Sequence, residues 1–167
     1  KAIGGRFGYS GLEASYQHYV GSPNFIELDL GADYIGYWGF KASGLYNFVF
    51  AQPAWTSRGD WSWYAGAGLS FGYVWDCGNK ATVELADGSK VSEYQRWGRG
   101  FMFSIPVQVG LSYTFWFPLQ LSVDIRPYIG LQNVSNKVAD GARVSRTGFY
   151  NQGLYGFVPT LSVHYAF

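Results

Sequence analysis

The sequence predicts an all-β protein, an eight-stranded antiparallel up-and-down β-barrel whose strands cross a membrane. Three observations lead to this fold class. Apolar and polar residues alternate along most of the 167 residues, which is the period of a half-buried strand. Charged residues make up only 14% of the chain, and they avoid one of the two strand faces. Short turns alternate with longer loops, as in membrane-spanning barrels.

The first four strands are expected at residues 2–9, 12–20, 25–35 and 39–54. Large apolar residues occupy every second position along them, as Leu28 and Leu30 do in the third. Their connections are short and rich in turn residues, with GSPN at 21–24 and TSRGD at 56–60. We therefore expect consecutive strands to pair side by side as antiparallel hairpins.

The last four strands are expected at residues 61–77, 100–115, 119–133 and 153–167. The uncharged stretch 100–123 comes nearest to a transmembrane helix. Its small and polar residues nevertheless fall at alternate positions, and it contains two prolines: Ser104, Gln108, Gly110, Ser112 and Thr114, with Pro106 and Pro118. This period of two indicates two strands, which we join by a turn at FWFP, residues 115–118.

Two connections are long, at residues 78–99 and 134–152. Both contain Asp-Gly between β-forming residues, in TVELADGSKVSEY and KVADGARV, and this dipeptide favours a hairpin turn. We expect each of them to extend a strand pair beyond the barrel. The whole chain, residues 1–167, is then one domain.

The charges separate the two faces of the expected strands. One face carries large apolar residues and no charge. The opposite face collects Arg6, Glu13, Gln17, Glu27, Asp29, Asp33, Lys41, Asn47, Tyr64, Gln108, Asp124, Arg126, Tyr128 and His164. A soluble barrel would turn its apolar face inward, which would crowd the interior with aromatic rings. The pattern favours the reverse, and a soluble barrel or sandwich is the alternative.

We expect the charged residues of the polar face to pair inside the barrel. This lumen ion network comprises Arg6, Glu13, Glu27, Asp29, Asp33, Lys41, Asp124 and Arg126. Eight strands enclose an interior about wide enough for side chains to fill, so the sequence does not favour a diffusion pore. The network is interpreted as structural filling.

Aromatic residues gather near the expected strand ends. Trp61, Trp63, Phe115, Trp116, Phe117 and Phe167 lie at the short-turn end, and Tyr34, Trp38, Tyr73, Trp75 and Phe157 lie nearer the other. Aromatic side chains at these two levels are typical of the interfacial girdles of a membrane barrel.

Composition excludes several other classes. The formal charge is +1 and no nucleic-acid-binding motif occurs, so no nucleic-acid partner is expected. Cys77 is the single cysteine, which excludes an intramolecular disulfide and a cysteine-rich metal site. With two histidines in the chain, no metal site built on imidazoles and no cofactor is expected. Strand-like sequence follows Lys1 directly, so we expect the mature form of an exported protein.

The chain resembles the small eight-stranded outer-membrane barrels of the OmpA/OmpX type, and most of all those of Bacteroidetes. The stretches that carry the resemblance are GGRFGYSGLEASYQHYV, NFIELDLG, GLYNF, WSWYAGAGLSFGYVW, GLSYTFWFPLQLSVDIRPYIGL and the terminal SVHYAF. The resemblance implies a Gram-negative outer membrane, a cleaved signal peptide and a lumen filled by side chains. It also implies that the barrel-assembly machinery reads the C-terminal aromatic residues, Tyr165 and Phe167. His164 stands where such relatives often have Arg.

The sequence leaves three functions open. We expect a non-enzymatic structural or interaction component, such as an accessory subunit of a larger outer-membrane complex. A lipid-modifying acyl hydrolase or acyltransferase is the first alternative, since Asp124, Ser162 and His164 would lie together if the last two strands paired with Asp124 opposite Ser162. His18 is the polar candidate on the lipid face. A small-solute channel is the second alternative.

The long loops are the remaining binding candidates. They carry basic residues beside acidic ones, with Lys80, Lys90, Arg96 and Arg99 in the first loop and Lys137, Arg143 and Arg146 in the second. We expect them to meet lipopolysaccharide phosphates or a protein partner, or simply to be solvated. Outer-membrane lipid is the expected surrounding of the barrel wall.

Overall fold

The computed structural model describes residues 1–8, 11–33, 39–75, 80–84, 90–94, 99–137, 143–153 and 159–167. These residues form twelve β-strands. The strands are β1 (Ala2–Gly8), β2 (Gly11–Tyr19), β3 (Phe25–Asp33), β4 (Gly39–Ala51), β5 (Asp60–Trp75), β6 (Lys80–Glu84), β7 (Lys90–Tyr94), β8 (Arg99–Thr114), β9 (Leu119–Ile125), β10 (Tyr128–Lys137), β11 (Arg143–Gln152) and β12 (Thr160–Ala166). In the part of the chain that is described, no helix is long and apolar enough to cross a membrane.

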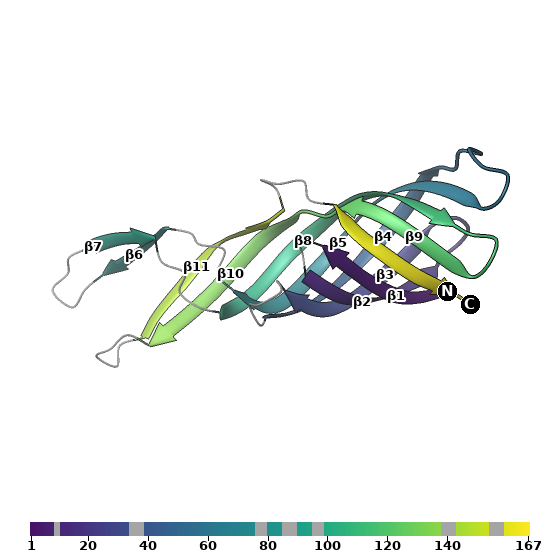
Figure 1. Ribbon diagram of the computed structural model, residues 1–167. Helices are drawn as coiled ribbons and strands as arrows, with labels where there is room; N and C mark the ends of the chain where they lie inside the picture. The colour runs from purple at the N-terminus through teal and green to yellow at the C-terminus, as the bar shows by residue number, and fades with distance from the viewer. Residues whose placement is uncertain are drawn as a thin grey trace.

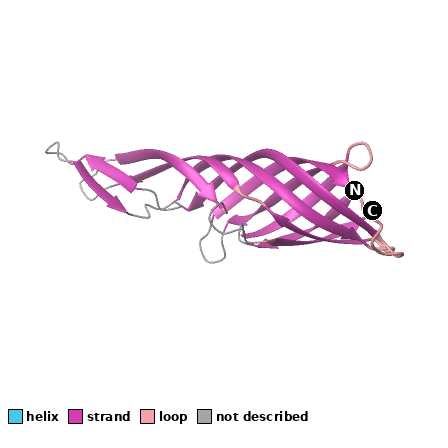
Figure 2. Ribbon diagram, turned by 90° about the horizontal axis from the view of Figure 1, so that it is seen from above, coloured by secondary structure: helices cyan, strands magenta, loops and turns pink. Residues whose placement is uncertain are grey.

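Eight of the strands close into an antiparallel barrel, which confirms the predicted all-β, eight-stranded architecture (Figures 1 and 2). Consecutive strands β1 to β5 pair with their neighbours, β5 pairs with β8, and β9 pairs with both β8 and β12. The ring is completed where β12 pairs with β1, from Ala2↔Ala166 to Phe7↔Leu161. The two chain ends therefore lie together at one end of the barrel (Figure 1).

The structure differs from the prediction in the last two strands, because the first of them is divided and the second begins later. The strand expected at 119–133 consists of β9 and β10, which are separated by Arg126 and Pro127. Proline has no N–H with which to continue a ladder, but its carbonyl oxygen accepts a hydrogen bond from the Val107 amide at 3.0 Å. Strand β8 therefore runs unbroken beside β9 and then β10.

The strand expected at 153–167 begins later, because β12 starts at Thr160. Residues 143–152, which the sequence placed in a connection, form β11 instead. This strand pairs with β10 from Tyr128↔Gln152 to Lys137↔Arg143. The ladder is the extension expected around Asp140-Gly141, although that turn lies outside the described residues.

The second expected extension is the hairpin of β6 and β7, which forms a separate two-stranded sheet. Lys80 is opposite Tyr94 and Glu84 is opposite Lys90, so the connection contains Asp87-Gly88, as predicted. Both hairpins lie at the end of the barrel away from the chain termini (Figure 1).

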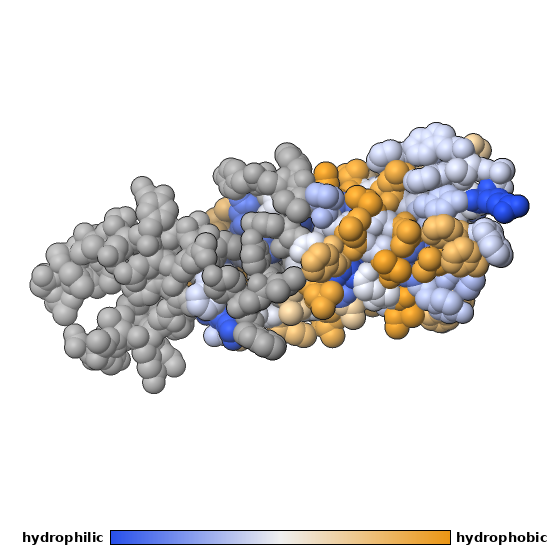
Figure 3. Space-filling model, viewed as in Figure 1, coloured by the Kyte–Doolittle hydropathy of each residue, from blue (hydrophilic) through white to orange (hydrophobic). Residues whose placement is uncertain are grey.

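The barrel wall is apolar outside and polar inside. Phe101 is 73% exposed, and Phe7, Leu28 and Leu161 are each more than half exposed. Arg6 and Glu27, by contrast, are almost completely buried. Figure 3 shows apolar side chains clustered over the barrel wall. The apolar residues of the predicted alternating pattern therefore face outward, and the polar residues face the lumen.

Aromatic rings form a continuous series at the short-turn end. Trp61 packs against Trp55 and Tyr113, with ring centroids 5.5 and 4.7 Å apart. The series continues from Tyr113 to Phe115 and from Phe115 to Phe117, at 4.6 and 4.9 Å. It joins the turn between β4 and β5 to the turn between β8 and β9. Of the aromatics expected at the other end, Tyr34, Trp38 and Phe157 lie outside the described residues.

Candidate functional site

The side chain of Arg6 crosses the lumen from strand β1. Its Nη1 donates a hydrogen bond to Glu27 on β3, and its Nη2 donates one to Asp124 on β9, both at 2.7 Å. Its Nε lies 3.5 Å from Glu13 and 3.9 Å from Asp29. Because these partners come from different sides of the barrel, Arg6 links opposite walls through its guanidinium.

Arg126 enters the same space from the break between β9 and β10. It makes ion pairs with Glu27 and Asp29, and its Nε donates a hydrogen bond to Gln108 Oε1 at 2.5 Å. Its Nη1 lies 3.7 Å from Glu13. Planar guanidinium groups suit this arrangement, because each presents several donors in a fixed geometry.

Lys41 completes the cationic part of the cluster. Its Nζ lies 3.1 Å from Glu13 Oε1 and 4.2 Å from the centroid of the Tyr128 ring. Glu13 is therefore held between Lys41 and the two arginines. The position over the Tyr128 ring adds a cation–π interaction, which the sequence alone did not indicate.

Two neutral side chains support the carboxylates. Tyr64 donates a hydrogen bond from its hydroxyl to Asp124 at 3.2 Å, and Gln17 donates one to Glu27 at 3.2 Å. Both residues were expected on the inner face, but no partner was assigned to either. The sequence indicated only that both side chains face the lumen, because each lies two residues along its strand from another inward-facing side chain.

Glycine makes room for this network at two positions. A Cβ atom at Gly110 would lie 2.6 Å from Tyr64 and from Asp124 Cβ, and one at Gly31 would lie 2.2 Å from the Leu12 carbonyl oxygen and 2.7 Å from Glu13 Cγ. A larger residue at either position would collide with a side chain of the cluster. Gly110 of β8 thus leaves room for the side chains of Tyr64 and Asp124, and Gly31 of β3 leaves room for the β2 backbone as well as for Glu13.

The described cluster contains three cations and four carboxylates: Arg6, Lys41 and Arg126 with Glu13, Glu27, Asp29 and Asp124. Seven of the eight residues predicted to form the lumen network therefore lie together. Asp33 is the exception, because only its backbone, at the end of β3, is described. Each cation contacts at least one carboxylate, so every buried charge among these seven has an opposite charge within 4 Å.

The arrangement required for a Ser-His-Asp triad is absent among the described residues. Asp124 is opposite Thr160, and Ser162 is opposite Ser122, so the expected pairing of Asp124 with Ser162 is wrong by two residues. Asp124 instead binds Arg6 and Tyr64. Neither the Ser162 hydroxyl nor either His164 ring nitrogen makes a hydrogen bond within the described structure.

His18 lies on the outer surface, as the sequence predicted. It is exposed near the end of β2, and its Nδ1 is 3.2 Å from the Tyr16 hydroxyl. In the described part of the chain, no group of three or more His, Cys, Asp or Glu residues is arranged to hold a metal ion. Comparison with known protein families, with curated proteins and with solved structures gave no match.

Proposed function

We propose that this protein is an integral β-barrel of a Gram-negative outer membrane. The protein would be exported to that membrane with a signal peptide that is then cleaved. The observation that carries the proposal is the apolar outer wall, on which residues such as Phe48, Val109 and Val163 are half exposed around the ring. A contiguous apolar surface of this extent is unstable in water and suits hydrocarbon. Outer-membrane lipid is then the immediate surrounding of the wall.

The lumen supports a barrel without a through-pore. The seven charged side chains of the cluster meet within the ring, and the Tyr64 and Phe25 rings pack 5.5 Å apart beside them. An aqueous channel needs a wider barrel than eight strands provide. We propose a non-enzymatic structural or interaction component, and the hairpins β6–β7 and β10–β11 support contact with lipopolysaccharide or a protein partner in a larger complex.

The first experiment introduces a charge into the proposed lipid face. Val109→Lys should destabilise the barrel in lipid vesicles by about 2–4 kcal/mol if the side chain lies near the bilayer midplane. Ser57→Lys, in the exposed β4–β5 turn, is the matched control and should change stability by less than about 0.5 kcal/mol. Urea unfolding followed by tryptophan fluorescence measures both. Equal stabilities, with wild-type protein that stays in solution without detergent, would instead indicate a soluble barrel.

The two alternatives make distinct predictions. A small-solute channel predicts discrete conductance steps in planar bilayers, whereas our proposal predicts none for the wild-type protein. A lipid-modifying enzyme predicts hydrolase or acyltransferase activity on lipid A that Ser162→Ala or His164→Ala abolishes. Either result would replace the proposed function.

A further inference from the structure

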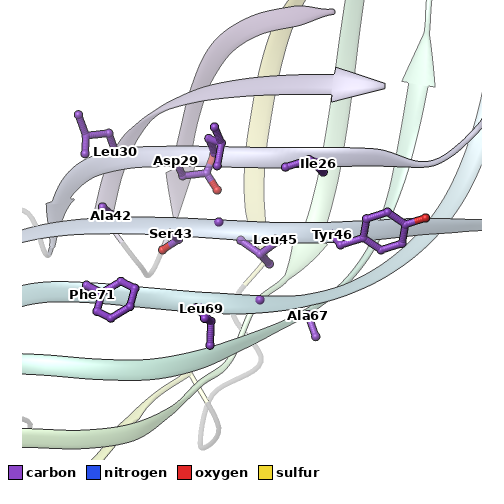
Figure 4. A pocket seen from close by; sticks show the side chains of 13 residues that line it. Ile26, Asp29, Leu30, Ala42, Ser43, Leu45, Tyr46, Ala67, Leu69 and Phe71 are labelled. Atoms are coloured by element: carbon purple, nitrogen blue, oxygen red, sulfur yellow. The ribbon is translucent and has the colours of Figure 1, made fainter. Parts of the chain in front are cut away.

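The outer wall of the barrel is hollowed over strands β3, β4 and β5. This groove has a volume of about 700 Å³, which is within the range of small-molecule sites. Figure 4 shows the side chains that line it. Three rows of paired residues cross it: Leu30–Ala42–Phe71, Leu28–Gly44–Leu69 and Ile26–Tyr46–Ala67.

Small residues between large ones produce the hollow. Ala42 and Gly44 form its floor on β4, while leucine and phenylalanine side chains rise from β3 and β5 on either side. The Leu28 side chain reaches over Gly44, because a Cβ atom at Gly44 would lie 3.3 Å from Leu28 Cδ2. A side chain added at Ala42 or Gly44 would therefore occupy the groove itself.

Exposed polar groups gather at one end of the groove, whereas Asp29 and Ser43, which also line it, are buried. Tyr46 closes this end, and its hydroxyl accepts a hydrogen bond from Asn24 Nδ2 at 3.1 Å. Asn24 belongs to the turn between β2 and β3. His18 is opposite Ile26, which is opposite Tyr46, so an exposed imidazole stands two strands, about 10 Å, from the tyrosine.

We propose that this groove binds one acyl chain of a glycerophospholipid, with the headgroup near His18, Asn24 and Tyr46. The inference rests on the proposed membrane location. From Tyr46 to Ala42 the groove runs four residues, about 14 Å, and a strand tilt of about 45° reduces this to about 10 Å across the membrane. One leaflet covers about half of a 30 Å hydrocarbon core, so the groove receives most of a single chain.

The position of the polar end selects the lipid. It lies beside a short turn, and the short turns of an outer-membrane barrel face the periplasm. The periplasmic leaflet supplies a glycerophospholipid, whereas lipopolysaccharide would approach from the end with the long hairpins. The exposed imidazole and the tyrosine hydroxyl are suitable hydrogen-bonding groups for phosphate and ester oxygens.

The test uses phosphatidylethanolamine vesicles containing a small fraction of the same lipid with a diazirine on one acyl chain. After reconstitution of the full chain and illumination, mass spectrometry maps the crosslinked residues. We expect crosslinks to concentrate at residues 26–30, 42–46 and 67–71, relative to the opposite wall at 121–125 and 161–165. Crosslinks spread evenly around the wall would refute lipid binding in the groove but support the membrane location. The absence of crosslinks everywhere would refute both the lipid binding and the membrane location.

Variants that fill the groove provide the second arm. Gly44→Leu and, independently, Ala42→Leu should reduce crosslinking at the groove about tenfold, while the crosslinks at 121–125 stay unchanged and report that the barrel has inserted. Ala14→Leu, on the exposed outer face of β2, is the matched control and should leave the groove signal at the wild-type level. If both groove variants retain the wild-type yield at 26–30 and 67–71, the proposal is wrong.

Discussion

Replacing Arg6 by methionine tests whether the charges of the lumen stabilise the barrel as a connected network. Arg6 is 1% exposed and contacts four carboxylates. In the variant Glu13 keeps Lys41, while Glu27 and Asp29 keep Arg126. Asp124 loses its cationic partner and keeps the hydrogen bond from Tyr64. One buried carboxylate is thus left without an opposite charge in contact.

The expected cost follows from that single uncompensated charge. Removing one partner of a buried ion pair destabilises a protein by about 3–5 kcal/mol. The double variant Arg6→Met/Asp124→Asn removes the unpaired charge. Its loss in free energy of unfolding should therefore be smaller than the sum of the losses of the two single variants by at least about 1 kcal/mol. Arg58→Met, in the exposed β4–β5 turn, is the control for loss of an arginine and should change stability by less than about 0.5 kcal/mol.

Urea unfolding of the reconstituted barrel, followed by tryptophan fluorescence, gives these free energies by linear extrapolation. The free energies can be compared only if the free energy of unfolding depends on urea concentration with a similar slope in every variant. A cost for Arg6→Met equal to that of Arg58→Met would refute the reasoning, because it would mean that Asp124 is solvated or protonated without Arg6. An additive double variant would show that Arg6 and Asp124 do not stabilise each other.

Two further predictions concern packing and assembly. Gly110→Leu should destabilise the barrel by about 1–3 kcal/mol, because the leucine side chain would collide with Tyr64 and Asp124. Gly5→Ala is the control and should unfold at nearly the wild-type urea concentration, because its Cβ would meet only the Glu13 carbonyl oxygen, at 3.8 Å. Phe167→Ser should lower the yield of heat-modifiable barrel in cells without changing the stability of refolded protein, as expected for an assembly signal; equal yields would remove that role from the C-terminal phenylalanine.

The interior could be predicted because strand parity is a local property. Once Arg6, Glu27 or Asp124 is placed on a strand, its neighbours at every second position determine which side of the wall it faces. The last two strands were expected to pair, but the register of β9 against β12 could not be predicted in the same way. In a closed barrel the register depends on strand tilt and stagger around the whole ring, and this is why Asp124 was expected two residues away from its actual partner.

The sequence indicated the end of β9 more clearly than it indicated strand β11. Pro127 was visible and marks the end of β9, but alternation continues through it from Asp124 to Tyr128, so the sequence favoured one strand. Strand β11 lacks clear alternation, since Phe149 and Tyr150 are adjacent, and its pairing with β10 depends on a ladder that begins near Asp140-Gly141. The Asp-Gly signal predicted the hairpin but not its length.

The break at Arg126–Pro127 also separates the ladders that close the ring from the hairpin of β10 and β11, which remains attached to the ring through the pairing of β10 with β8. The ladders that close the ring, β8 with β9 and β9 with β12, lie on one side of it, and the ladder of β10 with β11 lies on the other. An insertion or deletion beyond Val134, where the ladder of β10 with β8 ends, therefore leaves the register of the ring unchanged. Changes in the length of this hairpin are therefore uncoupled from the closure of the barrel, so the hairpin can be shortened or extended while the interior stays the same.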